Sequence, residues 1–241
     1  MEIFLILNFY FIISLIFCDI LKKKYLLFKS YSILDIYLYL VLYTVVLLTI
    51  FSAFNFINEF HATLIILILI FFCFNLKKLK KINFEFFFKS LLILNFILII
   101  CIDKEFIWWD EFSSWGLRTK EILIHNSIFY DNVVTNLKKP SGSSLLHYIF
   151  LKYIGFNESI IIFSQFTVTI LLLNSILDDF KIKKYPLINI IIFFLLIHFI
   201  SFTFNYGLFS IYTGVITSIL FLKIISILFI KDNNDLKKKA F

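Results

Sequence analysis

The sequence contains few residues that interrupt regular backbone or crosslink it: two Pro, five Gly and three Cys among 241 residues. So little Pro and Gly excludes flexible linkers, collagen-like repeats and glycine-rich phosphate loops. The three cysteines lie in separate apolar runs, too few and too scattered for a disulfide framework or a zinc site. We expect them to be buried thiols.

Charge is also scarce. Only 16% of the residues are charged, against roughly 25% in a soluble domain, and 61% are apolar. A water-soluble fold of this size has no interior large enough for so much Phe, Ile and Leu. The composition therefore excludes a soluble globular domain, and its hydrophobicity excludes disorder. For a chain of this kind the net charge of +7 does not indicate a nucleic-acid partner, and we expect none.

What the sequence has instead is a series of long apolar runs. A helix crosses the hydrocarbon of a bilayer with about 20 apolar residues. The runs cover residues 2–20, 32–56, 62–76, 86–102, 157–177, 186–204 and 207–230. A half-length run at 143–155 predicts a short or re-entrant helix. We therefore expect an all-α polytopic membrane protein with about seven transmembrane helices, the first of them a retained span rather than a signal peptide.

The lysines between these runs predict the topology. They follow the first, third, fifth and seventh runs, whereas no Lys or Arg follows the second or the sixth. The positive-inside rule then places the N-terminus outside, the C-terminus inside and residues 103–156 on the external face of a cytoplasmic membrane. The chain divides into four spans (1–102), an external loop (103–156), three spans (157–230) and a basic cytoplasmic tail (231–241). The excess of Lys and Arg over Asp and Glu indicates contact with anionic lipid headgroups.

The external loop carries most of the chemistry that this chain offers. All three Trp lie between residues 108 and 115, which predicts that Asp110 and Glu111 are held at the membrane–water interface. Apolar and polar residues recur from residue 108 at helical spacing, so we expect an amphipathic helix in the interface plane. Its expected apolar face carries Trp108, Phe112, Trp115 and Ile122, and its polar face Glu111, Ser114, Arg118, Glu121 and His125.

Simpler roles are open for these residues. Asp110 can be the N-cap of the helix, with Glu111 in its first turn. Arg118 and Lys120 can anchor the helix to lipid headgroups. Lone histidines such as His125 are more often hydrogen-bonded helix residues than ligands.

A second motif follows at residues 138–144. Pro140 and Gly142 mark a turn, and Ser143 or Ser144 can cap the half-length helix. Exposed amides at a helix start beside Lys138 and Lys139 suit an anionic phosphate. The alternative is a plain capped turn.

Together these motifs resemble a family. The run Trp109-Asp110-Glu111-Phe112, followed by Trp115 and Lys120, resembles the first external loop of GT-C-type glycosyltransferases, polytopic enzymes that use polyprenyl-phosphate sugar donors. The stretch from Pro140 to Tyr148 with Leu151-Lys152 is similar to the turn and helix that follow in that family, and Phe209-Ser210-Ile211-Tyr212 to a later one.

The resemblance implies a transferase that moves a sugar from a polyprenyl-phosphate donor to an envelope glycan or lipid acceptor. Asp110 would be the catalytic base, and Glu111 would support it or hold a divalent cation. Arg118, Lys120 and Lys139 would bind the donor phosphate. Family members usually have eight or more spans, so seven imply an N-terminal fragment or a second subunit. The alternative function is a non-catalytic membrane protein, either an assembly subunit or a transporter for envelope polysaccharide. A transporter normally carries charged residues inside its spans, and Lys223 is the only basic residue well inside a predicted span.

Overall fold

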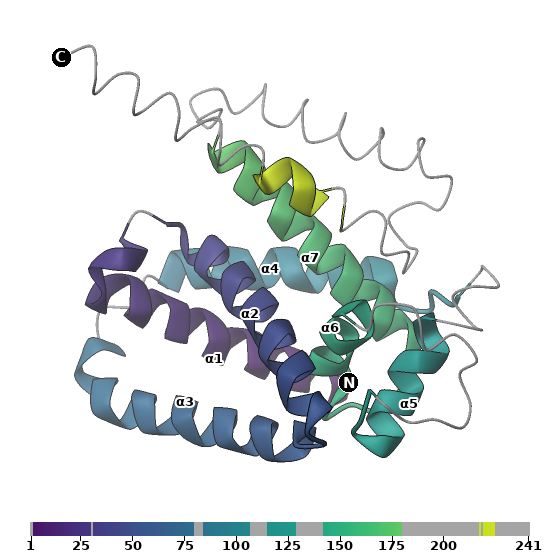
Figure 1. Ribbon diagram of the computed structural model, residues 1–241. Coiled ribbons are helices and arrows are strands. Elements are labelled where there is room, and N and C mark those ends of the chain that lie inside the picture. Colours follow the sequence, from purple (N-terminus) through teal and green to yellow (C-terminus); the bar gives the residue numbers. More distant parts are fainter. Residues whose placement is uncertain are drawn as a thin grey trace, which may run out of the picture.

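A computed structural model describes residues 2–29, 31–79, 84–106, 115–128, 142–179, 217 and 219–224. Throughout these ranges the regular structure is helical (Figure 1), which confirms the all-α class. The elements are α1 (Glu2–Lys24), the 3₁₀ turn η1 (Leu26–Phe28), α2 (Ile33–Ala53), α3 (Ile57–Leu79), α4 (Phe84–Cys101), α5 (Leu117–His125), α6 (Gly142–Leu151) and α7 (Glu158–Asp179).

Five of these helices are long and apolar enough to cross a membrane: α1, α2, α3, α4 and α7. They correspond to the first five predicted runs, so the chain is a multi-pass membrane protein. The third helix begins at Ile57, five residues before its apolar run, because Asn58, Glu59 and His61 are polar but helical. The predicted half-length helix is α6. The sixth run, most of the seventh and the basic tail lie outside the described residues.

Local chemistry explains where two helices begin and end. Helix α2 starts at a capping box: the Ser32 hydroxyl accepts a hydrogen bond from the Asp35 amide at 3.0 Å, and the Ser32 amide donates to the Asp35 carboxylate at 3.1 Å. These two bonds satisfy donors that a helix start otherwise leaves open. Helix α5 ends at Asn126, whose left-handed backbone (φ 51°) lets its amide bond back to the Ile122 carbonyl, as C-terminal caps do.

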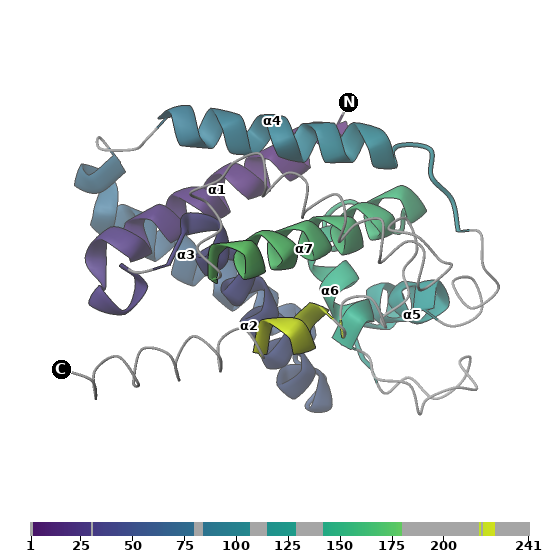
Figure 2. The ribbon, with the colours of Figure 1, turned by 90° about the horizontal axis from the view of Figure 1, so that it is seen from above.

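Helix α7 lies at the centre of the bundle. It packs against α4, α6 and α2, and 83% of its apolar stretch is buried, against 17% for α3. Helix α3 packs on α1 and α2 at the edge of the molecule (Figures 1 and 2). Its outward face exposes Ile66, Leu67, Ile70 and Phe74, a surface that suits lipid.

The helix ends segregate by charge. Helices α1, α3 and α7 end, and α2 and α4 begin, toward one end of the bundle, which we call the lysine-rich end because Lys22–Lys24 and Lys29 lie there (Figures 1 and 2). The start of α1, the turn at 54–56, residues 102–106 and helices α5 and α6 lie toward the other end, which we call the loop end. The fold thus groups the segments that the charge pattern assigned to one side of the membrane.

Candidate functional site

The site is built around the junction of α5 and α6 at the loop end. Trp115 is buried just before α5, and its carbonyl oxygen accepts hydrogen bonds from Thr119 Oγ1 at 3.0 Å and Ser144 Oγ at 3.5 Å. The second bond joins the beginnings of the two helices. The Trp115 backbone is therefore fixed against α6.

A second junction fixes the chain before the acidic pair. The Phe106 amide donates to the Glu158 carboxylate at 2.8 Å, and Ser159 Oγ donates to the Lys104 carbonyl at 3.0 Å. Glu158 and Ser159 both belong to the first turn of α7. The two described residues that flank the acidic stretch, Phe106 and Trp115, are thus held by hydrogen bonds to α7 and α6.

Asp110 and Glu111 lie outside the described residues, as do Lys139 and Pro140. Covalent geometry still limits their distance from the site. Glu111 precedes Trp115 by four residues, so their α-carbons are at most about 15 Å apart, from about 3.6 Å per extended residue.

Arg118 lies on the packed face of α5, not on a water-facing one. It is buried together with Thr119 and Ile122, and its guanidinium donates to the Ile128 carbonyl at 3.1 Å. The expected division of the helix is wrong at this position, because residue 118 is three positions from Trp115 and four from Ile122 and is buried with them. Its Nε has no partner among the described residues, and burial lowers its pKa.

The other cation of α5 is arranged differently. Lys120 is exposed, and its ammonium stands 5.6 Å from the centre of the Phe156 ring. The next residue is Glu121, and its Oε2 lies 3.3 Å from Nε2 of His125, one turn further along the helix. Helix α5 therefore offers one buried guanidinium, one exposed ammonium and one carboxylate–imidazole pair.

Gly142 and Ser143 lie in the first turn of α6, whereas the sequence predicts a turn at Gly142 with Ser143 or Ser144 as the helix cap. The helix begins at Gly142, so Ser143 and Ser144 lie in its first turn rather than ahead of it. Ser144 binds the Trp115 carbonyl, and Ser143 Oγ is buried without a partner among the described residues. A β-carbon on Gly142 would meet nothing within 4 Å, so space does not require glycine there.

A cluster around Lys152 was not found by the sequence analysis. The Lys152 ammonium donates to the side-chain oxygens of Asn58 and, at 2.8 Å, of Asn126. It also stands 5.3 Å from the Tyr148 ring centre, and the Tyr148 hydroxyl donates to Asn126 at 3.3 Å. The buried His61 ring packs edge-on against Tyr148 at 5.3 Å. No spacing in the sequence signals this cluster, because it joins residues at the ends of α3, α5 and α6.

Within the described ranges, Lys152 forms no salt bridge with a carboxylate. Amide oxygens and an aromatic face hold its charge instead, and burial lowers its pKa. We define Asn58, Asn126, Tyr148 and Lys152 as the Lys152 cluster. It fastens the end of α5 and the end of α6 to the start of α3.

His147 is a fully buried helix residue, as expected for a lone histidine. Its Nδ1 lies 2.7 Å from Ser164 Oγ, which itself donates to the Ile161 carbonyl at 2.7 Å. Burial lowers the pKa of His147 to about 3, so the ring is neutral. The described part of the chain holds no group of three or more His, Cys, Asp or Glu side chains arranged for a metal ion.

Comparisons of the chain with protein families, with curated proteins and with solved structures give no match. The functional argument therefore rests on the residues and their geometry.

Proposed function

We propose that the chain is a membrane glycosyltransferase, or part of one, that transfers a sugar from a polyprenyl-phosphate donor to a glycan or lipid acceptor on the external face. The observation that supports this proposal is that both flanks of the acidic stretch are fixed: Glu158 holds Phe106, and Ser144 holds Trp115. Catalytic groups need a positioned backbone, and fixed flanks are one requirement for it.

In the proposed reaction, Asp110 takes the proton from the acceptor hydroxyl while that oxygen attacks the anomeric carbon of the donor sugar. The bond between that carbon and the phosphate oxygen breaks, and the polyprenyl phosphate leaves with the electron pair. A carboxylate at the membrane interface lies at the depth of the donor phosphate, and a low-dielectric setting raises the pKa of a carboxyl group toward a useful range.

Cations near the acidic pair would stabilise the leaving phosphate. Arg118 and Lys120 of α5 suit this role differently, since one is buried and the other exposed. Lys139 would complete the set beside the turn at Pro140. Glu111 is adjacent to Asp110 and points about 100° away on a helix, so it is assigned to support the base or to hold a divalent cation.

The test is transfer by the full chain in nanodiscs, assayed with a panel of radiolabelled polyprenyl-phosphate sugars and membrane extract as acceptor. Asp110→Asn is expected to reduce the rate by at least about 100-fold, the lower range for loss of a general base. Asp103→Asn is the matched control: it makes the same change at an exposed position whose φ of 61° suits Asn. Transfer that survives Asp110→Asn, or no transfer from any donor, would overturn the proposal.

A non-catalytic role in envelope polysaccharide assembly or transport is the second candidate. The observation that favours it is Lys223, which is buried and donates to the Ser175 carbonyl of α7 at 3.1 Å. Ionisable groups buried among membrane helices often mark a pathway for a solute. In that case Lys223→Met would impair solute movement across proteoliposomes, whereas Asp110→Asn would not.

A further inference from the structure

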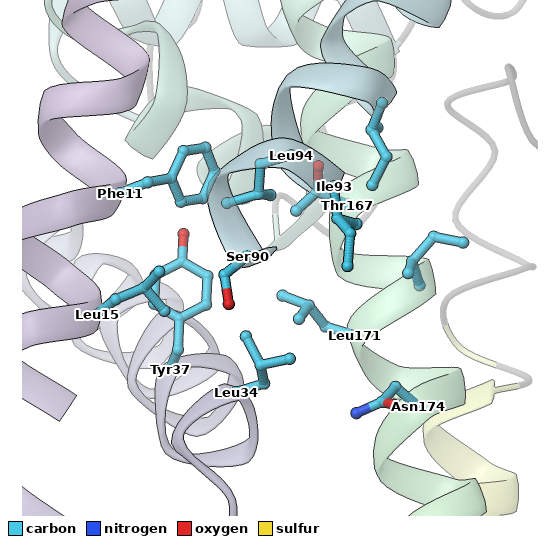
Figure 3. A pocket seen from close by; sticks show the side chains of 12 residues that line it. Phe11, Leu15, Leu34, Tyr37, Ser90, Ile93, Leu94, Thr167, Leu171 and Asn174 are labelled. Atoms are coloured by element: carbon cyan, nitrogen blue, oxygen red, sulfur yellow. The ribbon is translucent and has the colours of Figure 1, made fainter. Parts of the chain in front are cut away.

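A cavity of about 330 Å³ lies between α1, α2, α4 and α7. Figure 3 shows Phe11 at one end, Leu34 and Asn174 at the other, and Tyr37 and Leu171 along its walls. Protein interiors contain few voids larger than a water molecule, and destabilisation grows with the volume of an empty cavity. A void of this size in the middle of a bundle therefore calls for an occupant.

Water is a poor occupant. A buried water needs two to four polar partners, and the described walls are almost entirely hydrocarbon. The lining carries four polar side chains, those of Tyr37, Ser90, Thr167 and Asn174, and the other eight lining residues are aliphatic or aromatic hydrocarbon. These few polar groups leave most of the wall without partners for a chain of waters. An engineered apolar cavity of about 150 Å³ stays dry and binds benzene, so a cavity twice as large favours an apolar ligand.

The cavity reaches the lipid-facing surface of the bundle. Ile93 of α4 lines it and is 58% exposed. Because the described part of the chain has five helices long and apolar enough to span a membrane, we expect lipid hydrocarbon to surround that surface. The apolar ligand present at the highest concentration is therefore a lipid chain.

The register of the helices gives the cavity a direction. Leu34 is the second residue of α2, which begins at the lysine-rich end. Asn174 stands five residues before the end of α7, which closes at the same end. Phe11 lies near the middle of α1. The cavity thus extends from mid-membrane toward the end where Lys29 is exposed just before α2.

We infer that this cavity binds one acyl chain of an anionic phospholipid whose headgroup lies among the lysines of the lysine-rich end. The walls match the chain, and the lysines match the phosphate, because basic residues next to membrane helices attract anionic headgroups. The lysine-rich end is opposite the loop end with α5 and α6, and the inference does not depend on the proposed transferase activity.

The test uses the full chain in nanodiscs that contain phosphatidylglycerol with a photoactivatable diazirine in one acyl chain. Crosslinks are mapped by mass spectrometry. In the unaltered chain, label is expected on inward-facing wall residues, with Leu15 and Leu171 as the diagnostic positions. Leu94→Trp fills the cavity from α4 and should reduce that label at least fivefold.

Leu92→Trp is the matched control, since Leu92 lies on the same helix but is 55% exposed and does not line the cavity. It should leave the inward label unchanged. The same probe on phosphatidylcholine should label the walls several-fold less. Ser90→Leu fills the same cavity with a smaller change and replaces Leu94→Trp if that variant does not fold.

Three outcomes would count against the inference. Label confined to outward-facing residues, as expected if residues 180–216 of the chain fill the space, would overturn it. Equal loss of label in both Trp variants would do the same. Equal labelling by the two headgroups would overturn its anionic part.

Discussion

Asn8 of α1 and Asn95 of α4 form a reciprocal pair of side-chain hydrogen bonds, with each amide nitrogen 2.8 Å from the oxygen of the other. Each nitrogen also donates to the carbonyl one turn earlier in its own helix, Phe4 and Leu91 respectively. All four amide protons are therefore used. In hydrocarbon such a pair is a specific link between two otherwise apolar helices.

Asn95→Leu should destabilise the protein by about 1–2 kcal/mol, because the Asn8 amide loses its partner in a setting without water. Replacing both asparagines by Leu should cost less than the sum of the two single changes. Apparent melting of the four proteins in mild detergent gives the interaction energy. Strictly additive effects would mean that the pair is not coupled.

Asn126 offers a way to separate backbone from side-chain effects. Asn126→Gly keeps the left-handed conformation but loses the bonds to Lys152 and Tyr148, and should cost about 1–2 kcal/mol. Asn126→Ala loses the same bonds and adds roughly 1 kcal/mol of backbone strain. Thermal unfolding should therefore rank Asn above Gly and Gly above Ala. Equal stability of all three would show that the Lys152 cluster does not fasten α5.

His147 should make the protein acid-sensitive. Its pKa is about 3 when folded and about 6.5 when unfolded, so the unfolded chain binds more protons between these values. The free energy of unfolding is therefore highest above about pH 6.5. It falls as the pH drops, by about 3 kcal/mol at pH 4.5. His147→Asn keeps a donor toward Ser164 and removes the titration. Melting between pH 7.5 and 4.5 should show a smaller slope for the variant, and parallel curves would contradict this origin.

The topology can be measured with single cysteines. In a chain whose Cys18, Cys73 and Cys101 are replaced by Ser or Ala, Asp103→Cys should react with a membrane-impermeant maleimide in intact cells. Lys29→Cys should react only after permeabilisation. Both positions are exposed, so accessibility reports the side of the membrane. The reverse pattern would place the acidic pair in the cytoplasm.

The long helices were predictable because a 20-residue apolar run in lipid has one common solution: a helix that satisfies its own backbone. The start of α3 was missed because only apolar runs were counted as spans. Asn58 and His61 interrupt the apolar pattern without interrupting the helix. The Lys-rich turns predicted which helix ends lie together. The positive-inside rule places such turns on one side of the membrane, whatever tertiary contacts the helices make.

The sequence did not predict the contacts that join distant segments. Asn8 and Asn95 are 87 residues apart, and Lys152 and Asn58 are 94 apart; neither pair has a local signal. Helical periodicity placed Trp115 and Ile122 together on one apolar face, which the structure buries within the protein rather than against the membrane interface. Arg118 was assigned to the polar face by its charge. Its position was decided by tertiary packing instead: the side chain is buried, and its guanidinium donates to the Ile128 carbonyl.

The central position of α7 also bears on how the chain is made. Ser164, Gln165, Thr167 and Thr169 are all buried within the bundle, and they would face lipid if this helix entered the membrane alone. Ribosomes complete α1, α2 and α4 before α7, so these three helices wait in the bilayer with their inner faces uncovered. Insertion of α7 therefore depends on packing against the earlier helices as well as on transfer of apolar side chains into lipid. Because those helices are synthesised first, the surface on which α7 packs is already present.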